Sequence, residues 1–252
     1  MRRASPDEPS NECSDSLDEL PGFRRRFRIT PGAGWVRAEV EDDYHCMSLT
    51  VQHRDGIATT VEPAIQRAPW STCPGAVEQL KQTFTGVALE GFAERGEKRA
   101  NCTHLHDLAT LGAAHAFDDE PLVYDVLVSD PVDGRRQSEL RCNGVARLRL
   151  VLVDGQVVDP PEFAGVTLDK LGPWIASLEP RLQEGARVLR WGTMIANGRA
   201  IPLERQSDAS RMPIGNCFTF QPLMRAAARR IGEIRDFSAG TEQPLQERGP
   251  VA

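Results

Sequence analysis

The chain has no long apolar run. No segment approaches the roughly 18 consecutive apolar residues of a membrane span, and the first twenty residues are polar and acidic, unlike a secretory signal. These two absences predict a cytoplasmic protein with no membrane partner.

Several sequence motifs are also missing. We find no dinucleotide-binding glycine fingerprint, no P-loop, no H-E-x-x-H and no G-x-S-x-G. The six cysteines lack C-x-x-C spacing, which argues against a zinc ribbon or a thioredoxin-type motif. We therefore expect reduced thiols, no organic cofactor and no bound metal.

The chain has only three lysines, so most of its positive charge is on arginine. Its net charge is −6 at pH 7. This charge disfavours nucleic-acid binding. The one dense basic patch is Arg24–Arg28, within Phe23-Arg24-Arg25-Arg26-Phe27-Arg28. It could contact phosphate or an acidic partner, or be a solvated strand edge, which is the interpretation we favour.

The pattern of the chain predicts one α+β domain over residues 21–237, flanked by a disordered acidic tail (1–20) and a flexible tail (238–252). We expect an antiparallel sheet covered by helices. Strands are predicted at 35–40, 47–51, 57–61, 122–128, 145–153 and 156–158, helices at 76–84, 102–117, 168–182 and 220–237, and a hairpin at 188–203 around Asn197-Gly198. Strand, Asp-Gly, strand, loop and helix follow one another at 47–84 and again at 148–182, so the domain could consist of two similar strand-hairpin-helix halves.

The segment Asn101–His115 holds three of the five histidines of the chain. Asn101 is a good helix N-cap and Thr103 an alternative. On a regular helix His104 and His106 diverge by about 200°, whereas Cys102 and His106 share a face. We therefore take Cys102 with His106 as the natural pair.

Each group in this helix has two interpretations. The helix N-terminus and a neighbouring histidine would favour the Cys102 thiolate, and Asp107 could orient a histidine. A cysteine at such a position is also often only a small buried residue, and a histidine there can be a cap or a core group. His115 we interpret as structural.

A second candidate cluster lies upstream, in the acidic run that ends at Asp43-Tyr44-His45. Strand alternation would place Glu41, Asp43 and His45 on one face. Asp43 and His45 could then form a general base with its orienting group, or help to hold a divalent metal. The alternative is an exposed acidic strand end.

The third candidate segment is Arg67–Gly75, rich in proline around Trp70. Its indole could form the wall of an apolar pocket, with Arg67, Trp70, Cys73 and the upstream Tyr44 as substrate contacts. As plain structure it is a loop held by Trp70.

The stretch Thr85–Phe92 followed by Cys102-Thr103-His104-Leu105 resembles an uncharacterised bacterial family, catalogued as a domain of unknown function. The upstream Arg67–Cys73 element is also similar to that family. The chain departs from the family pattern at Asn101, where glycine is usual, and by the additional His106. The resemblance covers residues 35–230 loosely and implies a site around His104, with an apolar or aromatic substrate.

These observations lead to three hypotheses. In the first, the chain is a lyase or hydrolase of a small aromatic or acyl compound, in which His104, His106, His45 and Asp43 transfer protons and Cys102 shapes the site. A retro-aldol or decarboxylation-type cleavage of a carbon–carbon bond needs only such acids and bases. The second is a metal-dependent enzyme using His45, His104 and His106. The third is a non-catalytic binding module, and a homodimer is compatible with each.

Overall fold

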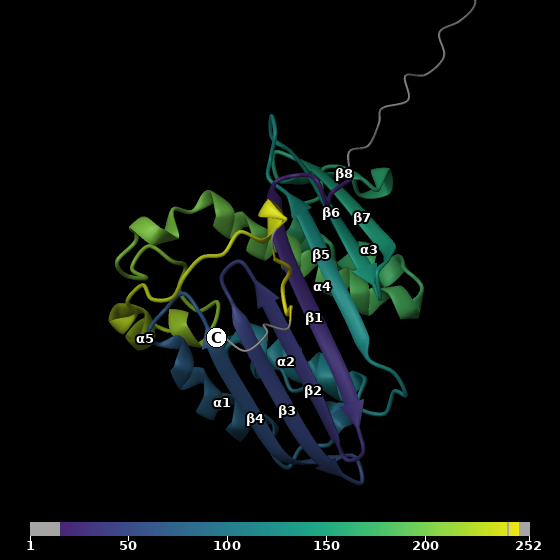
Figure 1. Cartoon of the computed structure of the whole chain (residues 1–252), viewed down its shortest axis with the longest axis vertical. Coiled ribbons are helices and arrows are strands. Elements are labelled where there is room, and N and C mark those ends of the chain that lie inside the picture. The colour runs from purple at the N-terminus through teal and green to yellow at the C-terminus, as the bar shows by residue number, and fades with distance from the viewer. Residues whose placement is uncertain (1–15, 241, 247–252) are drawn as a thin grey trace, which may run out of the picture.

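The structure is a computed structural model that describes residues 16–240 and 242–246. Its centre is one antiparallel sheet of eight strands in the order β4-β3-β2-β1-β5-β6-β7-β8 (Figure 1). The strands are β1 (Gly22–Gly32), β2 (Trp35–Asp42), β3 (Cys46–Arg54), β4 (Ile57–Arg67), β5 (Leu122–Ser129), β6 (Arg135–Cys142), β7 (Val145–Val153) and β8 (Gln156–Asp159). Two four-stranded meanders thus meet side by side at the β1–β5 pair.

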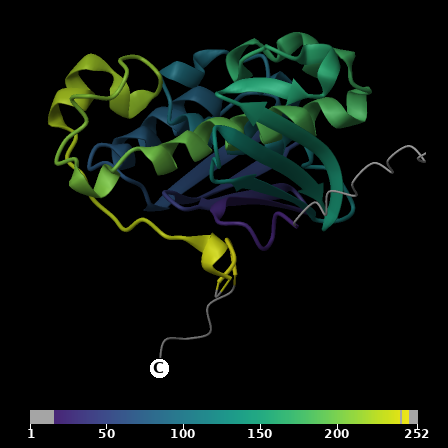
Figure 2. The ribbon, with the colours of Figure 1, turned by 90° about the horizontal axis from the view of Figure 1, so that it is seen from above.

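Helical segments follow each meander. They are α1 (Ala76–Phe84) and α2 (Thr103–Ala114) after the first, and α3 (Gly172–Ser177), α4 (Pro180–Ile195) and α5 (Pro222–Ala227) after the second. The long helix of each half packs on its own strands, α2 on β2 and β3, and α4 on β5 and β6. The helices cover one face of the sheet, whereas the C-terminal segment crosses the other face (Figure 2). The predicted α+β class is confirmed.

Strand alternation explains which side chains form the core. On β1, Phe23 and Phe27 are fully buried on the face that the helices cover, and β2 contributes Val36 to the same face. From α2, Leu105 and Leu108 close the layer, each with no exposed surface. Because Arg25 lies between Phe23 and Phe27 at alternate positions, its side chain also points into this core.

Two observed strands were missed, and three predicted elements differ clearly from the structure. The arginine-rich strands β1 and β6 were not predicted, because their polar composition hides the alternation. The predicted hairpin at 188–203 is wrong, because α4 continues to Ile195 and Asn197-Gly198 lies in the 3₁₀ turn that follows. The predicted helix at 220–237 is reduced to α5, and the one at 168–182 is divided between α3 and the start of α4.

The basic patch Arg24–Arg28 is neither a strand edge nor a free surface. It lies on β1, which pairs with β2 on one side and β5 on the other. Arg24 donates to the carbonyls of Leu17 and Leu20. Each of the other three arginines of the patch forms an ion pair with an acidic side chain on a neighbouring strand. These arginines are Arg25, Arg26 and Arg28, paired with Asp42, Asp125 and Glu39. The strand-edge interpretation is therefore wrong, and contact with phosphate or an acidic partner stays a prediction.

Parts of both predicted tails are ordered against the sheet. Leu17 is buried, and in the C-terminal segment the backbone N–H of Leu245 donates to Glu41 at 2.8 Å. Residues 1–15, 241 and 247–252 lie outside the described part of the chain. Within that part, no helix combines the length and apolarity that crossing a membrane requires.

Candidate functional site

The site begins at the turn between β2 and β3. Asp42 ends β2 on the core face, and its Oδ1 accepts hydrogen bonds from the backbone N–H groups of Tyr44 and His45, both at 2.8 Å. The same oxygen lies 3.0 Å from Nδ1 of His45. A carboxylate there holds the proton on Nδ1 and leaves Nε2 of His45 as a base. No described residue hydrogen-bonds to that Nε2.

Asp42 also forms a fully buried ion pair with Arg25. Burial by itself would raise the pKa of Asp42, but His45 and Arg25 outweigh it and hold the pKa below its usual value of 3.8. Asp42 is therefore an anion inside the protein, able to stabilise a positive charge that forms on His45.

Two arginines hold this turn from outside. Arg67 donates to the backbone carbonyls of Asp42 and Asp43, both at 2.7 Å, and Arg199 binds the Asp43 carboxylate at 2.6 Å. Burial raises the pKa of Asp43 to about 7 in spite of Arg199. The predicted pairing of Asp43 with His45 is wrong, because β2 ends at Asp42 and the chain turns before His45. Arg67 does not line the cavity described below and supports the turn instead.

His104 reaches the same place from the first turn of α2. Its ring lies against that of His45, with centroids 3.9 Å apart and an angle of 30° between the planes. Burial lowers the pKa of His104 well below 6.5, and His45 and Arg25 lower it further. His104 is therefore neutral at pH 7. Its Nε2 is buried and has no hydrogen-bond partner among the described residues.

The structure separates His104 from the other groups of α2. His106 packs against the ring of Phe84, with centroids 5.1 Å apart, and Asp107 pairs with Lys98. The expected Cys102–His106 pair is not formed, since Sγ of Cys102 lies 3.9 Å from Nδ1 of His104. Asn101 does not cap α2 either, because its side chain binds Thr83 and the carbonyl of Glu97, and Cys102 is the N-cap residue.

His115 has a structural environment, as expected. Its two ring nitrogens contact Asp118 at 2.7 Å and Glu184 at 2.8 Å. This ties the end of α2 to α4.

His45 and His104 line a cavity of about 350 Å³, here called the inner cavity. Its remaining walls are mainly apolar, and Tyr44, Trp70 and Cys73 contribute to them as the sequence predicted. Trp70 meets Phe220 edge to face, with ring centroids 6.5 Å apart. The apolar wall includes Met47, Ile195, Leu203, Met212 and Phe220.

Sequence reasoning missed the side of the cavity formed by residues 194–220. This segment connects short 3₁₀ turns and shows no periodic pattern, so nothing marked it as part of a site. The backbone N–H of Phe218 donates to the carbonyl of Asn101 at 2.9 Å, which joins the segment to the start of α2. The second half of the chain therefore completes a wall to which Tyr44, Met47, Trp70 and Cys73 also contribute, and both histidines come from the first half.

The thiols at the cavity are not activated. Burial raises the pKa of Cys102 to about 12 and that of Cys217 to about 11, and burial also raises the pKa of Cys73. Of the two interpretations of Cys102, the structure favours the small buried residue over the thiolate, because desolvation outweighs the effect of the helix N-terminus. Cys102 acts as a small apolar group whose sulfur lies 4.0 Å from that of Met47.

Asp42, His45 and His104 have ligand-type atoms within 4.8 Å of one another. Their arrangement does not suit a metal, however. The lone pairs of imidazole lie in the ring plane, so two rings stacked at 3.9 Å direct them past each other rather than at one ion. Asp42 is already bound to Arg25 and His45, and the predicted third ligand His106 lies elsewhere.

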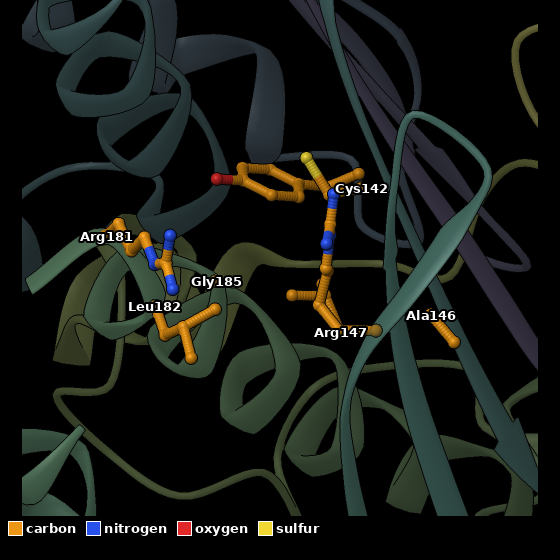
Figure 3. A pocket seen from close by; sticks show the side chains of 8 residues that line it. Cys142, Ala146, Arg147, Arg181, Leu182 and Gly185 are labelled. Atoms are coloured by element: carbon orange, nitrogen blue, oxygen red, sulfur yellow. The ribbon is translucent and has the colours of Figure 1, made fainter. Parts of the chain in front are cut away.

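The equivalent place in the second half has different chemistry. There the turn between β6 and β7 is the two-residue hairpin Asn143-Gly144, against three residues between β2 and β3. A hollow of about 420 Å³ lies between this turn and the start of α4. Figure 3 shows Arg147 on its strand side and Arg181 on its helix side. The longer turn of the first half is what carries Tyr44 and His45.

No family model matches the chain, and no curated protein shows significant similarity to it. The resemblance to a domain of unknown function therefore remains a prediction.

Proposed function

We propose that the protein is an enzyme that cleaves a carbon–carbon bond in a small aromatic or acyl compound by acid–base catalysis, without an organic cofactor. The observation that carries this proposal is the Asp42–His45 dyad, which opens into an apolar cavity with the neutral His104 stacked on it. A histidine oriented by a buried carboxylate is a common general base, and it contributes about 10²–10⁴ to a rate.

A retro-aldol cleavage fits these groups. Nε2 of His45 takes the proton of a β-hydroxyl group, the bond between the α and β carbons breaks, and an aldehyde leaves. The bonding electron pair passes to the carbonyl oxygen as an enolate, which then receives the proton at its α carbon. Asp42 stabilises the histidinium that forms between the two steps, and His104 hydrogen-bonds to the reacting oxygen.

The cavity also limits the substrate. Its volume of about 350 Å³ falls in the range of pockets for small molecules, and the aromatic pair Trp70–Phe220 suits a flat ring. We include a cytoplasmic location in the proposal, because the five cysteines in the described residues are free thiols.

The test is a panel of aromatic β-hydroxy carbonyl compounds incubated with the protein, with aldehyde release and mass spectrometry as readouts. His45→Gln should lower turnover by about 100-fold or more, and His104→Gln should lower it less. His53→Gln is the matched control, since His53 lies on β3 against Phe117 and does not line the cavity. Full activity of folded His45→Gln would disprove the proposal.

Two other candidate functions predict different experimental results. Stoichiometric metal in the purified protein, with activity lost to a chelator, would favour a metal-dependent enzyme using the same histidines. Tight binding of panel compounds that are never converted would favour a non-catalytic binding protein.

A further inference from the structure

A second hollow adjoins the inner cavity. This outer cavity has a volume of about 360 Å³ and is lined by charged side chains, among them Asp130, Arg136 and Arg199. The two cavities share Tyr44, Gly198 and Ile201 as wall residues. A molecule longer than the inner cavity would therefore extend past Tyr44 into the outer one.

Most charges in the outer cavity are already paired. Arg199 binds Asp43, Asp130 and Asp236, at distances from 2.6 to 3.3 Å. Arg235 lies within 3.6 Å of Glu41 and 3.4 Å of Glu242. These two cations therefore have little attraction left for a ligand.

Arg136 differs from them. No acidic side chain in the described part of the chain lies within ion-pairing distance of it, and its guanidinium donates only to Oδ1 of Asn197, at 2.5 Å. Its Nε–H is buried and has no acceptor among the described residues. Leaving a charged donor partly buried and unpaired is costly, so this guanidinium has the properties of a binding group.

Tyr44 supplies a second unused donor at the same boundary. Its side chain is only 4 % exposed, and its hydroxyl has no partner among the described residues. Burial raises the pKa of Tyr44, which keeps the phenol protonated and able to donate. The Tyr44 phenol and the Arg136 guanidinium both line the outer cavity. Two unpaired donors, one of them cationic, match the two oxygens of a carboxylate.

We infer that the outer cavity binds the carboxylate group of the substrate through Arg136 and Tyr44, while its apolar body lies in the inner cavity beside His45. The inference rests on the proposed function and narrows the substrate class to an aromatic or aliphatic acid. The carboxylate is then a remote binding group whose interaction energy positions the reacting end. Among the acidic residues that line the outer cavity, Asp130 and Asp236 pair with Arg199, whereas the exposed Glu204 forms no ion pair with a described residue, and solvent screens its charge.

The test compares binding of 3-phenylpropanoate and its neutral analogue 3-phenylpropanamide by titration calorimetry. The native protein should bind the acid about tenfold more tightly than the amide. Arg136→Gln should abolish this preference, Arg136→Lys should keep part of it, and Tyr44→Phe should weaken acid binding several-fold. Arg187→Gln, on an exposed position of α4, is the control and should change nothing.

Each contrary outcome has a clear meaning. Equal affinity for acid and amide in the native protein, no binding of either, or an undiminished preference in Arg136→Gln would overturn the inference. His45→Gln separates it from the proposed function, because this variant should keep the preference for the acid while losing turnover. Loss of turnover in His45→Gln without any preference for the acid would leave only the catalytic proposal standing.

Discussion

Arg25 and Asp42 lie directly opposite each other in the β1–β2 ladder, and their side chains form an ion pair in the core. Both residues occupy positions where strand alternation normally places apolar side chains. Asp42 uses its other oxygen to fix the turn that carries His45. One buried carboxylate thus links the stability of the sheet to the geometry of the site.

Removing the charge of Asp42 should therefore lower the free energy of unfolding of the protein. Asp42→Asn leaves Arg25 buried and unpaired, for which we expect a loss of about 3–5 kcal/mol in the free energy of unfolding, measured with urea. The control is Glu78→Gln, which breaks the exposed Glu78–Lys81 pair and should cost no more than about 0.5 kcal/mol. Equal stability of the two variants would show that the Arg25–Asp42 pair is not buried.

His115 should make stability depend on pH in the alkaline range. Its contacts with Glu184 and Asp118 raise its pKa from 6.5 to about 9. A folded-state pKa above the unfolded value stabilises the protein fully below pH 6.5, and this contribution is lost as the pH rises to about 9. Between pH 6 and pH 9.5 the free energy of unfolding of the native protein should fall by about 2 kcal/mol more than that of His115→Gln. Parallel pH profiles of the two in urea would contradict the assignment.

The two long helices should respond oppositely to the same substitution. A Cβ at Gly192 of α4 would lie 2.6 Å from Cγ1 of Val126 on β5, so Gly192→Ala should cost about 1–3 kcal/mol in thermal or urea unfolding. At Gly112 of α2 the nearest atom is 3.5 Å away, which is ordinary contact. Gly112→Ala should be neutral or stabilise by up to about 1 kcal/mol through helix propensity. A reversed order would mean that α4 is not seated on β5 as described.

Cys102 should be a poor nucleophile in the native protein. Since burial raises its pKa to about 12, iodoacetamide at pH 7.5 should modify the half-buried Cys142 before Cys102, as peptide mass spectrometry would show. In urea both should react. Fast labelling of Cys102 in the native protein would show that it is a reactive nucleophile. In that case Cys102→Ala should lose activity.

The sequence was sufficient for elements with a strong local signal. Helix α1 was predicted with its observed bounds and α2 nearly so, because apolar residues recur at helical spacing in both. The hairpin around Asp55-Gly56 was also predicted, since that pair forms the β3–β4 turn. The Asn197-Gly198 pair failed as a hairpin signal because the long helix α4 runs directly into it.

The pairing of the site residues could not be obtained from the sequence. His45 and Tyr44 were named as candidates and both line the inner cavity, but the partner of His45 depends on where β2 ends, and alternation gave Asp43 instead of Asp42. Arg25 was hidden in a patch that looked like surface. Arg136 and the segment at 194–220 reach the cavities only through tertiary packing, of which local composition carries no sign.

The histidines of the inner cavity come from the first half of the chain, whereas its apolar walls come from both halves. A fragment ending near residue 118 would contain Asp42, His45 and His104, yet its binding site would be open to water on the side where Leu203 and Phe220 belong. The first half alone should therefore fail to enclose a ligand. A split version of the protein, cut between α2 and β5, should regain ligand binding only on reassembly of both pieces.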